Sequence, residues 1–136
     1  MSGEGSQGRV INPWTWQDPF AFVQAREVSA AQRVVYCAGQ TSVDDDGNPL
    51  HEGDLRAQVG RAFDNLETVL GEAGLDLSNV VRLNYYTTDV DALIENWDVI
   101  ATRLNDAGAR VTSTALGVAR LAFPPLLVEI EATAVA

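Results

Sequence analysis

The stretch "DLRAQVGRAFDNLETVLGEAGLDLSNVVRLNYYTTDV", residues 54–90, decides the fold of this chain. Its first half repeats apolar residues at spacings of three and four, which predicts a helix with one buried face. These positions are Leu55, Val59, Ala62, Phe63, Leu66, Val69, Leu70 and Ala73. Asp54 is a suitable N-cap, and Gly74 is a suitable stop after the last apolar position. The second half, residues 79–90, is rich in β-branched and aromatic residues and predicts a strand.

The rest of the chain supplies the other elements of one domain. We expect strands that begin near Phe22 and over residues 33–43, a second helix that starts near Asp89, and strands over 111–121 and 126–136. This order predicts an α+β domain with one mixed β-sheet and two helices on one face of it. Residues 9–136 would form the domain, and the polar, Gly-rich residues 1–8 a flexible arm.

The last predicted strand has two different faces. Apolar residues alternate with a mixed set that contains Glu129, Glu131 and Thr133. The strand before it, "ALGVARL", is apolar on both faces, and a monomer should not leave such a sheet face bare. We therefore expect symmetric self-association. Glu129 on the covered face is a candidate general base or water-holding group; the alternative is a structural pair with an arginine such as Arg120.

Composition limits the partners and cofactors. Nine arginines, no lysine and nineteen acidic residues give a net charge of −10, which disfavours nucleic acid as a partner. Cys37 is the only cysteine and His51 the only histidine, so neither a disulfide, a metal site nor another cofactor is expected. No apolar run reaches membrane-spanning length and no signal-like core is present, so we expect a cytoplasmic protein without a membrane partner.

Several short motifs have two readings each. Gly39 in "AGQTS" either lets a backbone N–H approach a ligand or relieves a bulge in the strand. Aromatic clusters more often belong to a core or an interface than to a ligand-binding site. The cluster near the N-terminus consists of Trp14, Trp16, Phe20 and Phe22. The hydroxyl run Thr112–Thr114 either binds a ligand or satisfies neighbouring strands. None of these motifs identifies a function alone.

Taken together, four segments resemble the Rid family, also called the YjgF family. They are "FVQA", "YCAGQTSVDDDG", "QVGRAFDNLETVLGEAGLDLSNVVRLNYYTTDV" and "GVARL…LLVEIEATA", and the resemblance runs from about residue 20 to residue 136. It implies a chorismate-mutase-like domain and a homotrimer whose three sheets form a central barrel. It also implies small-molecule clefts at the subunit interfaces, and an activity that hydrolyses enamines and imines to a keto acid and ammonia.

The chain departs from the family at several cleft positions. Counting back from "VARL", the arginine that grips the substrate carboxylate falls at Ser113, and a proline two residues earlier falls at Val111. The family's N-terminal tyrosine falls at Phe22, and the asparagine of the second helix falls near Trp97, a much bulkier side chain. Ala115 takes the place of a cysteine that is reactive in some members. The resemblance therefore implies a divergent member with a more apolar cleft.

Other positions match or compensate. Gly39 and Glu129 agree with the family pattern, which implies that Glu129 positions the attacking water while the Gly39 backbone polarises the substrate. Tyr86 is expected beside the cleft, and Arg110 could replace the missing arginine if it reaches the same cleft. Two functions stay open: a divergent imine or enamine deaminase, and a non-catalytic binder of an imine, enamine or carbonyl compound. An endoribonuclease activity, associated with some relatives, ranks last because of the acidic charge.

Overall fold

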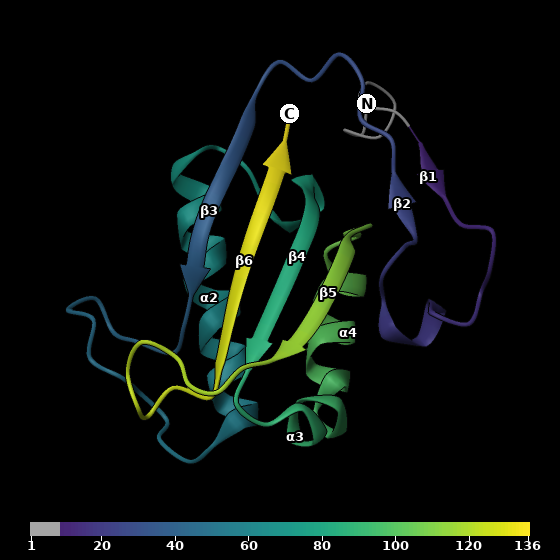
Figure 1. The fold of residues 1–136 in the computed structure, drawn as a ribbon. Coiled ribbons are helices and arrows are strands. Elements are labelled where there is room, and N and C mark those ends of the chain that lie inside the picture. Colours follow the sequence, from purple (N-terminus) through teal and green to yellow (C-terminus); the bar gives the residue numbers. More distant parts are fainter. Residues whose placement is uncertain (1–8) are drawn as a thin grey trace.

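A computed structural model describes residues 9–136, and its centre is a four-stranded sheet (Figure 1). The strands are β3 (Val34–Gln40), β4 (Val80–Thr87), β5 (Thr112–Gly117) and β6 (Val128–Val135), in the spatial order β3-β6-β4-β5. Strands β4 and β5 are parallel, and the other neighbouring pairs are antiparallel. The predicted mixed sheet is confirmed. The arm expected at residues 1–8 lies outside the described residues.

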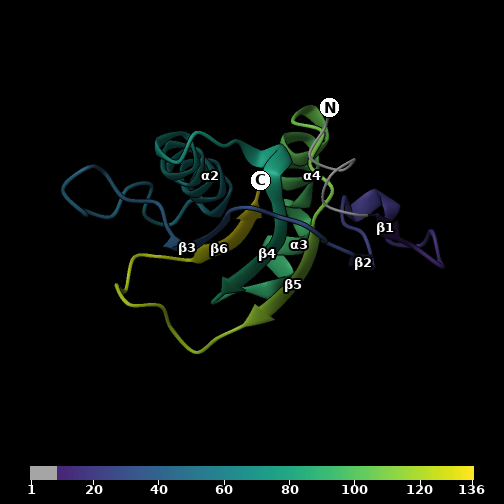
Figure 2. The same cartoon turned by 90° about the horizontal axis from the view of Figure 1, so that it is seen from above.

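The helices pack on one face of the sheet (Figure 2). Helix α2 (Leu55–Glu72) begins as predicted, because the Asp54 carboxylate accepts a hydrogen bond of 3.0 Å from the Ala57 amide. The second helix was expected to be continuous, but it is divided into α3 (Val90–Glu95) and α4 (Trp97–Asp106). Asn96 separates them: its side-chain amide donates to the Ala92 carbonyl at 2.8 Å, and its backbone leaves helical geometry.

The core lies between the helices and the sheet. The helical stripe is fully buried at Val59, Phe63, Leu66 and Leu70, and it faces the apolar side of β6. On β6 the predicted alternation is confirmed, since Val128, Ile130, Ala132 and Ala134 are buried. No helix of residues 9–136 covers the opposite side, which we call the open face (Figure 2). Tyr36 of β3 lies on this open face and is 81% exposed.

Residues 9–27 form a separate unit beside the sheet (Figure 1). The prediction of a strand that begins near Phe22 is wrong in its position, because Phe22 itself lies in no strand. Instead β1 (Val10–Ile11) pairs with β2 (Ala25–Arg26), and a 3-10 turn, η1 (Asp18–Phe20), lies between them. Pro19 favours such a turn, and Ala21 then adopts a left-handed conformation (φ 59°) that reverses the chain.

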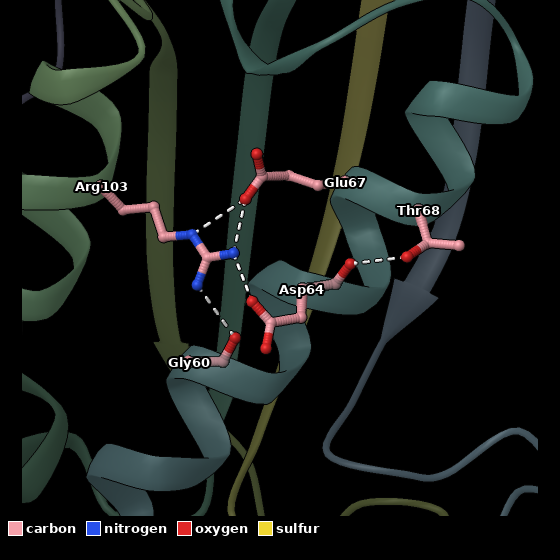
Figure 3. Close-up of polar contacts among 5 residues, drawn as sticks. All are labelled: Gly60, Asp64, Glu67, Thr68 and Arg103. Atoms are coloured by element: carbon pink, nitrogen blue, oxygen red, sulfur yellow. Dashed lines mark hydrogen bonds and ion pairs between the residues drawn. The ribbon is translucent and has the colours of Figure 1, made fainter.

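Arg103 joins α4 to α2 (Figure 3). Its guanidinium donates to Glu67 at 2.9 Å and to the Gly60 carbonyl at 3.2 Å, and it also binds Asp64. It lies over the ring of Phe63, 5.6 Å from the ring centre. Partial burial of the guanidinium works against its charge, but the two carboxylates outweigh this and raise the pKa of Arg103. The cluster fixes α4 against the core and so positions Trp97 at its start.

Candidate functional site

A pocket of about 260 Å³ lies between the N-terminal unit, the paired helices and the edge strand β5. We call it the aromatic pocket. Its lining residues are Trp16, Phe20 and Phe22 from the N-terminal unit, Ile94 and Trp97 from α3 and α4, and Ser113 and Ala115 from β5. Three residues expected from the sequence to bind a ligand, Phe22, Trp97 and Ser113, therefore meet in one pocket, and no charged side chain lines it.

The rings of the pocket stand at steep angles to one another. Trp16 meets Phe22 edge-on, with ring centres 5.9 Å apart, and Phe20 meets Trp97 in the same way at 6.5 Å. The Trp97 indole N–H donates a hydrogen bond of 2.8 Å to the Phe20 carbonyl. That donor is therefore engaged within the protein, which leaves the Ser113 hydroxyl as the polar side-chain group of the lining.

A buried amide network holds the N-terminal unit in shape. The Gln17 side chain is inaccessible to solvent, donates to Asn12 at 2.9 Å and to the Trp14 carbonyl at 3.1 Å, and accepts from Gln24 at 3.0 Å. The Val23 amide then donates to the Val111 carbonyl at 2.8 Å, which ties this unit to the start of β5. The aromatic side chains are thus presented by a chain segment that the hydrogen bonds of the buried Gln17 side chain hold in shape. Sequence reasoning missed Gln17.

The register of β5 sorts the hydroxyl run into two sides. Ser113 pairs with Leu83 and Ala115 with Tyr85, and both partners are buried beneath the helices. Because side chains alternate along a strand, Thr112 and Thr114 point to the opposite side. Arg82, for example, donates to the Thr114 hydroxyl at 3.1 Å. Only the middle residue of the run therefore belongs to the aromatic pocket.

Gly39 and Glu129 form a second candidate group, on β3 and β6. A Cβ atom on Gly39 would lie 2.0 Å from Oε2 of Glu129, so the glycine makes room for this carboxylate. Glu129 lies on the open face, because its neighbours along β6, Val128 and Ile130, are buried on the other side. The β3–β6 register also shifts between Cys37 and Gln40, so Gly39 lies at an irregularity of the strand, as the second reading of this glycine expected, as well as beside the Glu129 side chain.

Tyr86 also lies on the open face, where it pairs with Glu129 in the β4–β6 register. Its hydroxyl donates to Glu131, and Asn84 donates to the same carboxylate at 3.2 Å. These hydrogen bonds, with the nearby charge of Arg82, lower the pKa of Glu131, and the bond to Glu131 raises the pKa of Tyr86. Tyr86 is thus committed to Glu131 and does not line the aromatic pocket.

The two candidate groups are separated within one chain. Gly39 lies on β3 and Ser113 on β5, and these strands are opposite edges of the sheet. Arg110 joins neither group: it lines a different hollow of about 290 Å³, together with Asn12, Asp18 and Phe22. Phe22 stands between the hollow and the aromatic pocket, since it lines both.

Residues 9–136 show neither a metal-binding cluster nor a helix able to span a membrane. Residues 9–136 hold no group of three or more His, Cys, Asp or Glu side chains that could bind a metal. His51 lies exposed in a turn with a positive φ of 62°. Within the same range, no helix combines the length and hydropathy needed to cross a bilayer.

Comparison with known proteins gives a consistent result. The family model described as endoribonuclease L-PSP matches residues 18–136. A RutC family protein of Aquifex aeolicus is 30% identical over 115 residues, which are 85% of this chain and 86% of that protein. The crystal structure of YyfB, a Rid family protein of Yersinia pestis, superposes with a TM-score of 0.83 at 36% identity and covers 94% of this chain and 98% of that one.

A more distant structure shares the fold alone. Escherichia coli TdcF, solved with bound serine, superposes with a TM-score of 0.69 at 23% identity, over 96% of this chain and 94% of that one.

Proposed function

Because the chain belongs to the Rid (YjgF) family, we propose that it is a homotrimer whose aromatic pocket binds a small imine, enamine or carbonyl compound without a carboxylate anchor. The observation that carries this proposal is the composition of the pocket. Phe22, Trp97 and Ser113 meet there, and the lining has no charged residue.

Ser113 argues against an amino-acid-derived imine as the preferred ligand. An arginine would hold a carboxylate with two charge-assisted hydrogen bonds, each worth roughly 1.5–3 kcal/mol. The Ser113 hydroxyl offers one neutral hydrogen bond in their place. Arg110 lies in the neighbouring hollow, on the other side of Phe22. A carboxylate in the aromatic pocket would therefore be desolvated without compensation.

The separation of the two candidate groups supports a site completed by a second subunit. Strands β3 and β5 are the free edges of the sheet, and they are different surfaces. Contacts between two different surfaces generate a ring when the rotation closes. In such a ring, the β5 edge of one subunit would meet the β3 edge of the next, and the aromatic pocket would adjoin the strands that carry the neighbour's Gly39 and Glu129. Leu116 on β5 is 50% exposed in the single chain and would be covered.

In this arrangement the reaction would be the hydrolysis of a C=N bond. Water adds to the imine carbon, its two protons pass to the nitrogen, and the C–N bond breaks to give a carbonyl compound and ammonia. Glu129 would orient the water and accept its first proton, as a positioned carboxylate can. The Ser113 hydroxyl would hydrogen-bond the nitrogen. The chemistry needs no metal or organic cofactor.

A non-catalytic binder is the second candidate. One observation favours it: no carboxylate lines the aromatic pocket of a single chain, so catalysis depends wholly on the neighbouring subunit. Nucleic acid is not proposed as a partner, in spite of the description of the family model, because a net charge of −10 repels phosphates.

Two measurements test the proposal. Light scattering or sedimentation should give a trimer. Imines with and without a carboxylate would be generated in situ, and carbonyl release would be followed against an enzyme-free blank. We expect faster release from the imine without a carboxylate, loss of that activity in Glu129→Gln, and a gain on 2-aminoacrylate in Ser113→Arg.

The outcomes separate the candidates. Binding without turnover in the trimer would favour the accessory function. A wild-type preference for aminoacrylate would contradict the argument from Ser113, and a monomer would contradict the completed site.

A further inference from the structure

We propose that the aromatic pocket selects organic cations, so that the ligand class is a small cation such as a protonated imine and neither an anion nor a neutral isostere. This inference rests on the proposed function, because it assumes that the pocket of Trp16, Phe20, Phe22 and Trp97 is the ligand site. It adds the sign of the ligand charge.

The rings of the pocket are arranged in a way that suits a cation. An aromatic ring is negative over its face and positive at its edge, and a cation is attracted to the face. Trp16 is inclined at 76° to Phe22, and Phe20 at 73° to Trp97, so these walls are nearly perpendicular to each other. Walls at such angles can turn ring faces toward one cation in the pocket from more than one direction. A planar neutral ring would prefer parallel walls.

The polar side-chain group that the pocket leaves for a ligand can accept a hydrogen bond. The Trp97 N–H, a donor that would favour an anion or a carbonyl oxygen, is bonded to the Phe20 carbonyl at 2.8 Å. The Ser113 hydroxyl has lone pairs and can accept a hydrogen bond from a protonated nitrogen. With no arginine or histidine in the lining, nothing in the pocket repels a positive charge.

The electrostatic field around the pocket also favours a cation. The chain carries a net charge of −10, which raises the local concentration of cations near its surface. Glu95 follows the lining residue Ile94 in α3 and forms no ion pair with another residue of the described part of the chain. Its carboxylate therefore adds to the negative field near the pocket.

Three probes of similar shape test the charge preference. Choline carries a trimethylammonium group, 3,3-dimethylbutan-1-ol replaces its nitrogen by carbon, and 3,3-dimethylbutanoate has the same branched head beside a carboxylate. Binding to the full-length protein would be followed through the indole N–H signals of its three tryptophans in ¹H–¹⁵N NMR. We expect choline to bind roughly 5-fold to 30-fold more tightly than the neutral alcohol, which corresponds to about 1–2 kcal/mol of cation–π attraction. The carboxylate should bind most weakly.

Two pairs of variants control the result. Trp16→Leu removes a wall of the pocket, and Trp14→Leu removes a tryptophan of similar exposure that does not line it; the exposed fractions are 61% and 58%. Only Trp16→Leu should reduce the preference for choline over the alcohol. Ser113→Arg should reverse the preference toward the carboxylate, whereas Ser113→Met, of comparable length but uncharged, should not.

The failures are distinguishable. If the alcohol binds as tightly as choline, selection by charge is overturned while the pocket stands as the ligand site. If the carboxylate binds best to the wild type, both the inference and the argument from Ser113 fail. If none of the probes shifts the Trp16 or Trp97 signals, the assignment of the pocket fails, and the inference with it.

Discussion

Replacing Trp97 by phenylalanine tests how the pocket is held together. The indole is 8% exposed, contacts Tyr85 at a ring distance of 5.0 Å, and donates to the Phe20 carbonyl at 2.8 Å. The change removes that hydrogen bond, which costs about 1 kcal/mol. It also removes part of a buried ring, which costs about another 1 kcal/mol of lost apolar contact. We expect the free energy of unfolding to fall by about 2 kcal/mol per subunit.

Urea denaturation at one fixed protein concentration would measure this loss, because the stability of an oligomer depends on concentration. With an m-value of about 2 kcal/mol/M, the midpoint should fall by about 1 M. Hydrogen exchange should also become faster at the Val23 amide, because this amide belongs to the N-terminal unit and is protected by its hydrogen bond to the Val111 carbonyl. Trp14→Phe is the matched control and should change neither quantity. If Trp97→Phe behaves like this control, the bond to Phe20 does not hold the N-terminal unit in place.

Three further predictions concern other parts of the chain. Arg103→Met removes the link between α4 and α2 and should lower stability by about 1–3 kcal/mol in thermal melts; an unchanged melting temperature would show that the exposed carboxylates contribute nothing. Gly39→Ala forces the Glu129 side chain from its position, so carbonyl release should fall as far as in Glu129→Gln, while stability changes by less than about 1.5 kcal/mol. The folded pKa of Glu131 is lowered, chiefly by the bond from Tyr86, so its stabilising effect is complete above the unfolded pKa near 4.5 and is lost as pH falls through the lower folded value. When the urea midpoint is plotted against pH, it should therefore fall less steeply in this acidic range for Glu131→Gln than for the wild type. Parallel curves for the two proteins would contradict this prediction.

The fold was predictable where a pattern repeats over several turns or strand positions. Residues 54–90 gave a helix and a strand, and the structure has α2 at Leu55–Glu72 and β4 at Val80–Thr87. The alternation of the last strand also gave the correct buried face. Residues 9–27 were not predictable in this way. Their strands have two residues each, and a period cannot be read from two residues.

The pocket was predictable in part, and by a different route. Counting from "VARL" placed Ser113 in a cleft, and the structure groups it with Phe22 and Trp97. Their role in binding stays a prediction, as does that of Glu129. Arg110 shows that closeness in sequence does not place a residue in the same pocket. It precedes Ser113 by three residues, and its side chain lines another hollow. The burial of Gln17 could not be predicted from the sequence, because a buried amide differs from an exposed one only in its hydrogen-bond partners, which the fold brings together.

The position of β6 in the middle of the sheet has a consequence for synthesis of the protein. Strand β3 pairs with β6 and with no other strand of the main sheet, and 119 of the 128 described residues precede Val128, where β6 begins. While the ribosome makes the residues between β3 and β6, β3 has no partner strand in the main sheet. During the same time the apolar stripe of α2 has no complete sheet to pack against. Closing so long a loop is slow. A nascent chain stalled before residue 128 should therefore expose hydrophobic surface and bind chaperones, and release of the last strand should end that interaction.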